Sequence, residues 1–191
     1  MPELKLVLGS KSPRRQALIQ ELGFPVEVRI KEVDEIYPDE LAPEKVPEFL
    51  AQLKAEPLTD GLKQDEVLIT SDTIVLLEGE VIGKPKSAED ARKMLRKLSG
   101  KTHAVITGVS MRSNEKHHSF SSVTNVFFSE LTDDEIAHYV EKYSPMDKAG
   151  SYAIQEWIGY IGVAKIEGCY YNVMGLPLHD LNHNLKVHFL N

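Results

Sequence analysis

Two adjacent arginines stand where a helix is expected to begin, in the segment Ser12-Pro13-Arg14-Arg15. The segment follows the apolar run 4–9 and precedes a helix-like stretch, so Ser12 fits the N-cap and Pro13 fits the first turn. A helix N-terminus already carries partial positive charge, which makes two guanidinium groups unfavourable there on their own. Free backbone N–H groups together with two guanidinium forks favour a bound anion, and a phosphate matches them best. The alternative is a pair of solvated surface arginines.

Short polar clusters follow apolar segments at several other points of the chain. They supply lysines for phosphates, carboxylates for a metal or a water, and an amide for the edge of a nucleobase. That inventory suits the cleavage of a nucleotide phosphoanhydride. The clusters are Glu32 to Glu35, Ser71-Asp72-Thr73, Gly83-Lys84-Pro85, Asp147-Lys148-Ala149-Gly150 and Ile154-Gln155.

The two acidic candidates are Asp72 and Glu35. Asp72 follows an apolar segment expected to form a buried strand, so its carboxylate is expected at a sheet edge on a fixed backbone. A carboxylate is a weak base at neutral pH, but it can orient a water whose acidity a metal has raised. Glu35 can give the metal a second carboxylate or hold a positive residue in place. The alternatives are an Asp72 that only caps a turn and a Glu35 that is a solvated loop acid.

Four further residues are candidates for substrate contacts. Lys54 lies near the C-terminal end of an expected helix, where the dipole alone favours a lysine. Lys84 precedes a proline that keeps it extended, and we expect it to contact phosphate. Thr73 and Gln155 are candidates for reading the base. A glutamine amide donates and accepts at once, so it can match the edge of uracil, whereas a surface loop position is the alternative for Gln155.

With these motifs in this order, the chain resembles the Maf family of nucleoside triphosphate pyrophosphatases over nearly its whole length. The resemblance implies a two-lobed fold like that of inosine triphosphate pyrophosphatases, a homodimer, and a divalent metal such as Mg²⁺, Mn²⁺ or Co²⁺. It makes Asp72 the proton acceptor for the attacking water and Lys54 a phosphate ligand. The motifs that carry it are Leu8 to Arg15, Ser71 to Thr73, Gly83 to Pro85, Leu98 to His103, Asp147 to Tyr152 and Asn172 to Leu178.

Within the family, three positions resemble the subgroup that acts on dTTP and UTP. Arg14, Thr73 and Gln155 match that subgroup, whereas the subgroup acting on 7-methyl-GTP tends to carry Trp, Gln and Glu there. The chain departs from the dTTP/UTP pattern at Ser71, where Ala is more usual. It also departs at 156–158, where Glu-Trp-Ile replaces a more glycine-rich stretch, so the loop after Gln155 is expected to differ in shape.

The elements that must position these residues predict an α/β fold. Strands and helices alternate early, and longer strands follow, which favours a large mixed sheet with flanking helices and two lobes around a central cleft. We expect one domain spanning 1–191. The expected helices are 12–22, 43–56, 88–98, 133–142 and 176–187, and the expected strands are 4–9, 26–30, 67–70 continued by 74–77, 81–82, 103–112, 118–130 and 160–166.

Composition narrows the function classes. The formal net charge of −7 over 191 residues disfavours a nucleic-acid binder, although an acidic protein can still concentrate positive charge in one pocket. No apolar run reaches the length of a membrane span, and the N-terminus does not read as a signal peptide. Cys169 is the single cysteine, so intramolecular disulfides are excluded and a reducing cytoplasm is the expected setting. We read Cys169 as a packing residue.

The resemblance to the Maf family and its dTTP/UTP subgroup implies a house-cleaning hydrolase that converts dTTP and UTP to the monophosphate and pyrophosphate. Modified pyrimidine triphosphates are further candidate substrates. The alternative is a nucleotide-binding regulator of septum formation that does not turn its ligand over. Metal-dependent release of pyrophosphate distinguishes the enzyme from the regulator.

Overall fold

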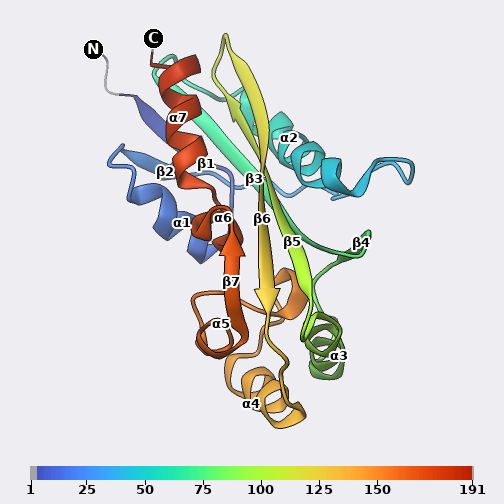
Figure 1. Ribbon diagram of the computed structural model, residues 1–191. Coiled ribbons are helices and arrows are strands. Elements are labelled where there is room, and N and C mark those ends of the chain that lie inside the picture. The colour runs from blue at the N-terminus through green and yellow to red at the C-terminus, as the bar shows by residue number, and fades with distance from the viewer. Residues whose placement is uncertain (1–3, 191) are drawn as a thin grey trace. The chain divides into compact units, whose positions relative to one another are not determined.

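The computed structural model describes residues 4–190, and within them the strands form a seven-stranded mixed sheet (Figure 1). Neighbouring strands follow the order β2-β1-β3-β5-β6-β7, and β4 pairs with β3. β1 is parallel to β2 and β3, whereas the β3–β4 and β6–β7 pairs are antiparallel. The expected mixed α/β class is therefore confirmed. The strands are β1 Lys5–Leu8, β2 Val26–Val28, β3 Glu66–Leu77, β4 Glu80–Ile82, β5 Thr102–Arg112, β6 His117–Phe128 and β7 Val163–Glu167.

The chain divides into two compact units. Unit 1 consists of the described residues up to Asp72, together with Thr107–Ser122 and the described residues from Gly175 onward. Unit 2 consists of Thr73–Ile106 and Val123–Met174. Three strands, β3, β5 and β6, contribute residues to both units.

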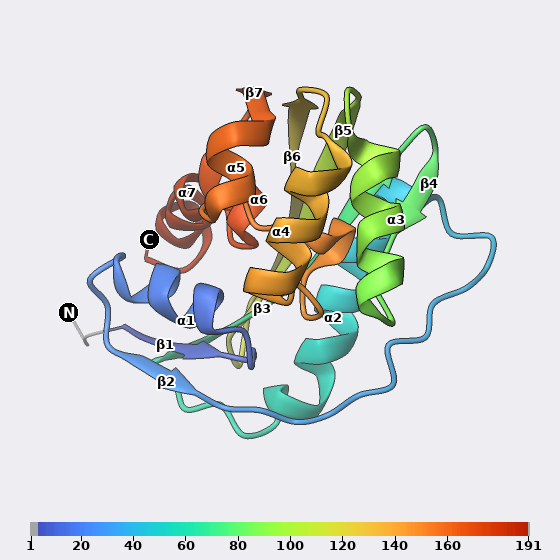
Figure 2. The same cartoon turned by 90° about the horizontal axis from the view of Figure 1, so that it is seen from below.

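Unit 1 contains the helices α1, α2 and α7. Ser12 caps α1 by accepting a hydrogen bond from the Arg15 N–H, which confirms the predicted helix start. α1 packs beside β2 (Figures 1 and 2). A small apolar core between α2 and the strands consists of Val7, Ala55, Leu58, Leu62 and Leu68. The helices are α1 Pro13–Gln20, α2 Val46–Thr59 with the 3₁₀ turn Pro43–Lys45 before it, and α7 Leu178–His188.

Unit 2 contains the helices α3 to α6. α3 (Ala88–Leu98) begins at the cap Ser87, and α4 (Asp133–Tyr143) begins at a Thr132 capping box, both as the cap residues predict. The two helices lie side by side (Figures 1 and 2). The turn from β3 to β4 is a hairpin: Glu78 and Gly79 have φ of 52° and 83°, as a type I′ turn requires.

The sequence prediction is wrong around Gly159. The segment expected to begin a strand at Tyr160 is instead the helix α5 (Trp157–Gly162), and β7 starts only at Val163. A Cβ on Gly159 would lie 1.9 Å from the Ile154 carbonyl oxygen, so this turn depends on a backbone contact that residue propensities do not encode. The sequence also missed the 3₁₀ turn Ala149–Ser151 and the short helix α6, Tyr170–Met174.

The composition led to two further expectations, one about membrane-spanning segments and one about Cys169. Every helix in the described residues is too short or too polar to cross a lipid bilayer. Cys169 is half-buried, and its backbone N–H and carbonyl both bond the Thr124 hydroxyl, which agrees with a packing role.

Candidate active site

In unit 1, the parallel strands β1 and β3 place two of the predicted motifs on neighbouring chain segments. Leu8 pairs with Ile69, so the segment leading to Ser12 and the segment leading to Asp72 leave that pair in the same direction. Gly9 permits this close exit, because a Cβ there would lie 2.6 Å from Thr70 Cγ2. The carboxyl ends of parallel strands are where α/β sheets usually bind ligands.

The sequence predicted that Asp72 follows the end of a strand at a sheet edge, and this prediction is wrong. β3 continues through Asp72 to Leu77, and β3 lies inside the sheet between β1 and β5. The β-branched residues Thr70, Thr73, Ile74 and Val75 favour extended backbone on both sides of Asp72, so nothing interrupts the strand. The rigid backbone expected for the carboxylate is present, although it comes from the middle of a strand.

Lys54 joins the two acidic candidates. Its Nζ lies 2.6 Å from Asp72 Oδ1 and 3.1 Å from Glu35 Oε1. α2 runs on to Thr59, so Lys54 lies inside the helix and the helix dipole does not explain it. The Thr70 hydroxyl donates to the Ala51 carbonyl at 2.6 Å, which fixes α2 against β3 and holds Lys54 beside Asp72.

Arg15 lies within electrostatic reach of the same carboxylates. Its Nε donates to the Gly175 carbonyl at 2.8 Å, which orients the guanidinium group. Burial lowers the pKa of Arg15, the nearby Asp72 and Glu35 carboxylates oppose that shift, and Arg14 adds to it. Unit 1 thus brings together the Arg14-Arg15 pair, Lys54 and two carboxylates that are far apart in the sequence.

The sequence predicts that Asp72 and Glu35 hold a divalent metal ion, and the positions of the two carboxylates can be compared with that prediction. Within residues 4–190, no group of three or more His, Cys, Asp or Glu side chains is arranged to hold a metal ion. Asp72 and Glu35 instead meet at one position, where the Lys54 ammonium lies. Mg²⁺ is commonly held by one or two carboxylates together with substrate phosphates and water, so this donor set fits an ion that shares its coordination with a triphosphate.

In unit 2, three segments that carry predicted residues are neighbours. Thr73 lies on β3 directly after Asp72, and Lys84 lies exposed in the loop after β4. Gly150 contacts both segments: its N–H donates to the Gly83 carbonyl at 3.0 Å, and a Cβ on it would lie 2.9 Å from Val75 Cγ2. Its φ of 68° requires a glycine-like conformation, so Gly150 fixes how the loop leading to Gln155 begins.

Gln155 is half-buried, and its amide oxygen is enclosed. In the part of the chain that the structure describes, Gln155 Oε1 is buried without a hydrogen-bond partner. Its backbone carbonyl accepts a hydrogen bond from the Tyr160 hydroxyl at 2.8 Å. Buried polar atoms are normally paired, so an enclosed acceptor of this kind is suited to a ligand N–H. Gln155 therefore lies in a loop with its side chain only partly exposed, and its role in reading the base stays a prediction.

Sequence reasoning missed three residues around this loop: Tyr139, Lys148 and Glu156. The Glu156 carboxylate accepts a hydrogen bond from Tyr139 and pairs with Lys148. Lys148 belongs to the Asp-Lys-Ala-Gly motif and Glu156 to the segment that departs from the Maf pattern, so both carried a signal. Tyr139 carried none, because a buried helical tyrosine is usually packing. A fourth residue, Ser71, is also notable: its buried Oγ has no hydrogen-bond partner among the described residues.

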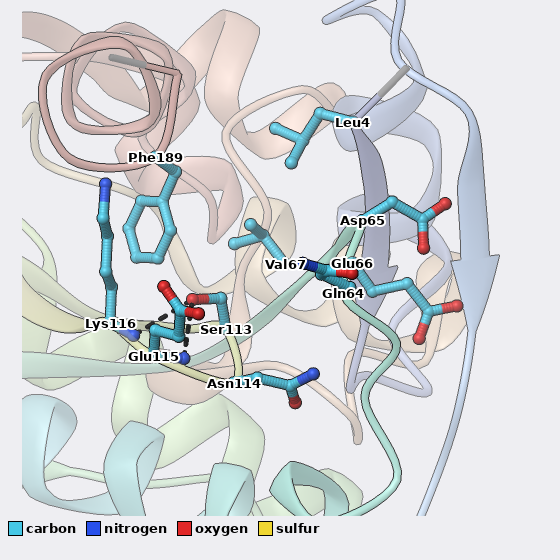
Figure 3. Close-up of a pocket in the computed structure, with 10 residues that line it drawn as sticks. All are labelled: Leu4, Gln64, Asp65, Glu66, Val67, Ser113, Asn114, Glu115, Lys116 and Phe189. Atoms are coloured by element: carbon cyan, nitrogen blue, oxygen red, sulfur yellow. Dashed lines mark hydrogen bonds between the residues drawn. The ribbon is translucent and has the colours of Figure 1, made fainter. Parts of the chain in front are cut away.

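A separate pocket of about 630 Å³ lies in unit 1 (Figure 3). It lies at the amino-terminal ends of β1 and β3, because its lining includes Leu4 and the segment 64–67. The Phe189 ring and the β5–β6 turn at Ser113 and Lys116 complete its wall (Figure 3). None of the residues predicted to do chemistry lines it.

Comparison with known proteins places the chain among close relatives. A family model described as Maf-like protein matches residues 5–188. The chain is 51% identical over 187 residues to the dTTP/UTP pyrophosphatase of Phocaeicola vulgatus, covering 97% of both chains. It is 48% identical over 182 residues to the dTTP/UTP pyrophosphatase of Christiangramia forsetii, covering 95% of this chain and 93% of that protein.

Solved structures give a more distant match. The Ham1 protein of Staphylococcus aureus aligns with a TM-score of 0.47 at 18% identity, covering 65% of this chain and 71% of that one. The nucleoside-triphosphatase, or dITP/XTP pyrophosphatase, of Mycobacterium abscessus aligns with a TM-score of 0.45 at 12% identity, covering 67% of this chain and 76% of that one.

Proposed function

Because the chain belongs to the Maf family, we propose that it is a nucleoside triphosphate pyrophosphatase that hydrolyses dTTP and UTP to the monophosphate and pyrophosphate. The relatives that share about half of its residues over nearly the whole chain are dTTP/UTP pyrophosphatases. The structural observation that carries the proposal is the placement of Lys54 between Asp72 and Glu35, with Arg15 in reach.

The basic groups are proposed to bind the triphosphate. Ser12 caps α1 and Arg15 lies in its first turn, where backbone N–H groups and the helix dipole favour an anion. The Nε bond from Arg15 to Gly175 restrains the guanidinium plane, which favours forked contacts to phosphate oxygens. Lys54 and Lys84 add ammonium groups that attract phosphate as point charges.

Asp72 and Glu35 are proposed to hold a divalent cation, with Mg²⁺, Mn²⁺ and Co²⁺ as the candidates. When bound, such an ion makes a coordinated water more acidic and offsets negative charge on the phosphates. The two carboxylates already converge on one positive charge, the Lys54 ammonium, which supports this assignment. Phosphate oxygens and water would supply the other ligands of such an ion.

Asp72 is proposed to act as the base in the chemical step. Its carboxylate accepts a proton from a water whose oxygen bonds to the α-phosphorus. The bond from that phosphorus to the α–β bridging oxygen breaks, and pyrophosphate leaves. A base fixed on a rigid strand suits this role, because proton transfer needs the acceptor within hydrogen-bond distance of the water. Arg15 and Lys54 stabilise the negative charge on the phosphate oxygens as the bond breaks.

Arg14, Thr73 and Gln155 are proposed to select the base. The enclosed Gln155 Oε1 supports this role, because uracil and thymine present an N–H that such an acceptor can bind. The amide nitrogen can donate to an adjacent base carbonyl. A base that left these groups unpaired would lose the hydrogen bonds at a cost of about 1–3 kcal/mol.

We further propose that the protein is a cytoplasmic homodimer. Sedimentation would test the oligomeric state, and cell fractionation would test the location.

A substrate panel tests the proposed activity. Wild-type protein is incubated with equal concentrations of dTTP, UTP, ATP, GTP and 7-methyl-GTP, with and without Mg²⁺, and the monophosphate and pyrophosphate are quantified. We expect metal-dependent pyrophosphate release, fastest with dTTP and UTP. Nucleotide binding without turnover under all metal conditions would reject the enzyme and favour a nucleotide-binding regulator.

A further inference from the structure

The loop that carries Gln155 is tied to α4 by one buried hydroxyl. Tyr139 accepts a hydrogen bond from the Ala153 N–H at 3.2 Å and donates to Glu156 Oε2 at 2.5 Å. The tyrosine is fully buried, and burial together with the Glu156 carboxylate raises the pKa of its hydroxyl, which therefore stays protonated. A single anchored atom thus fixes the chain on both sides of Gln155.

The second oxygen of Glu156 is also engaged. Lys148 Nζ lies 3.4 Å from Glu156 Oε1 and 2.9 Å from Asp147 Oδ1. Only 9% of the Lys148 side chain and 23% of the Glu156 side chain are exposed, whereas 58% of the Asp147 side chain is. Charges this far from water persist when they are paired and hydrogen-bonded, so the Tyr139–Glu156–Lys148 chain is a specific arrangement and not an incidental surface contact.

Two further contacts restrict the same loop. The Tyr160 hydroxyl holds the Gln155 carbonyl at 2.8 Å. Gly159 packs so closely on Ile154 that a Cβ would lie 1.9 Å from its carbonyl oxygen. Residues 153–156 are therefore held by a buried tyrosine, a buried lysine and the start of α5, which leaves the Gln155 backbone little room to shift.

We propose that Glu156, held by Tyr139 and Lys148, is a positioning residue that sets the Gln155 amide for selection of the base. This inference rests on the proposed base-reading role of Gln155. A general brace of the fold would affect all substrates alike. A positioning residue affects the part of the transition-state binding that depends on the base, and leaves the phosphate-binding groups of unit 1 unchanged.

The experiment compares Glu156→Ala, Glu156→Gln and Tyr139→Phe with wild type. For each protein, kcat and KM are measured with UTP and with ATP, and the inhibition constant of inorganic pyrophosphate is measured as a readout of phosphate binding. Glu156→Ala and Tyr139→Phe should each lower kcat/KM for UTP at least tenfold, mainly through KM. Activity on ATP and inhibition by pyrophosphate should stay within about twofold of wild type. Glu156→Gln should recover most of the loss, because its amide oxygen can still accept the Tyr139 hydrogen bond.

A matched control is Glu141→Ala, which removes another carboxylate–cation pair of unit 2, with Arg92 at 2.8 Å. It should leave all three readouts unchanged. Equal losses with UTP, ATP and pyrophosphate in the Glu156 variants would overturn the inference, and so would an unchanged ratio of UTP to ATP activity. Wild-type protein that releases no pyrophosphate from UTP, or shows no preference for it, would instead refute the proposed function itself.

Discussion

Replacing Gln155 with glutamate gives the sharpest test of base selection. The amide oxygen of Gln155 is buried without a hydrogen-bond partner in the described chain, and the Glu156 carboxylate follows it directly. Gln155→Glu keeps the shape of the side chain but turns its donor end into a second acceptor. A uracil or thymine carbonyl that met an amide N–H in the wild type would then face a negative charge.

The size of the effect follows from the contacts at stake. One lost hydrogen bond in an enclosed site, together with an unpaired carbonyl, costs about 1–3 kcal/mol. That range corresponds to a fall in kcat/KM for UTP and dTTP of about five- to 160-fold. The variant need not gain activity on 7-methyl-GTP, because Arg14 and Thr73 still match the subgroup that acts on dTTP and UTP.

The assay is steady-state pyrophosphate release from each nucleotide of the panel. Gln64→Glu serves as the matched control. Gln64 is an exposed glutamine just before β3, so its substitution makes the same chemical change away from the candidate site. Unchanged kcat/KM in Gln155→Glu would refute a base-reading role. If 7-methyl-GTP is the best substrate of the wild type, the subgroup assignment is wrong, and the serine at position 71 was its more informative residue.

Four further outcomes are expected. Asp72→Asn should lower kcat at least about a hundredfold while calorimetry still detects nucleotide binding, and near-normal turnover would reject Asp72 as the base. Arg15→Ala should weaken binding of the triphosphate more than binding of the nucleoside, with the difference shrinking as salt rises; equal losses for both ligands would exclude a phosphate role. The Glu66 carboxylate accepts hydrogen bonds from both terminal nitrogens of the Arg29 guanidinium group, at 2.6 and 2.8 Å. These bonds lower the pKa of Glu66 from 4.5 to about 2. The unfolded chain binds that proton more readily, so the free energy of unfolding in urea should fall between about pH 4.5 and 2, with a shallower fall in Glu66→Gln; identical slopes would contradict this. Ser71→Ala removes a buried hydroxyl that has no hydrogen-bond partner within residues 4–190, and it should raise the free energy of unfolding by up to about 1 kcal/mol, whereas a decrease would reveal a partner for that hydroxyl.

Local signals in the sequence located most elements of the fold. Ser12, Ser87 and Thr132 are side-chain caps, and each begins a helix at the predicted position. The hairpin at Glu78-Gly79 was readable for the same reason, because a turn type is set by its own residues. The helix α5 was not readable, since Gly159 adopts it against the Ile154 backbone and strand propensity favours the opposite assignment.

The candidate site was predictable as a list of residues but not as an arrangement. Asp72, Lys54 and Arg15 were identified by residue type and motif, yet their contacts depend on how α2 docks on β3 and on a carbonyl near the C-terminus. The partner of Glu35 was left open between a metal and a positive residue, and the structure gives it Lys54. The Tyr139–Glu156 bond joins a helix to a loop, and no spacing rule connects such positions.

The bond from Arg15 to the Gly175 carbonyl has a consequence for the order in which the protein matures during synthesis. It links positions that are 160 residues apart, and Gly175 opens the last chain segment of unit 1. On the ribosome, Asp72, Lys54 and all of unit 2 are made before that segment emerges. Contacts of such long sequence separation form late, because the loop between them must be closed first. A nascent or C-terminally truncated chain therefore contains Asp72 and Lys54 but lacks the contact that orients Arg15, so the proposed binding of a triphosphate by Arg15 would require the segment that begins at Gly175.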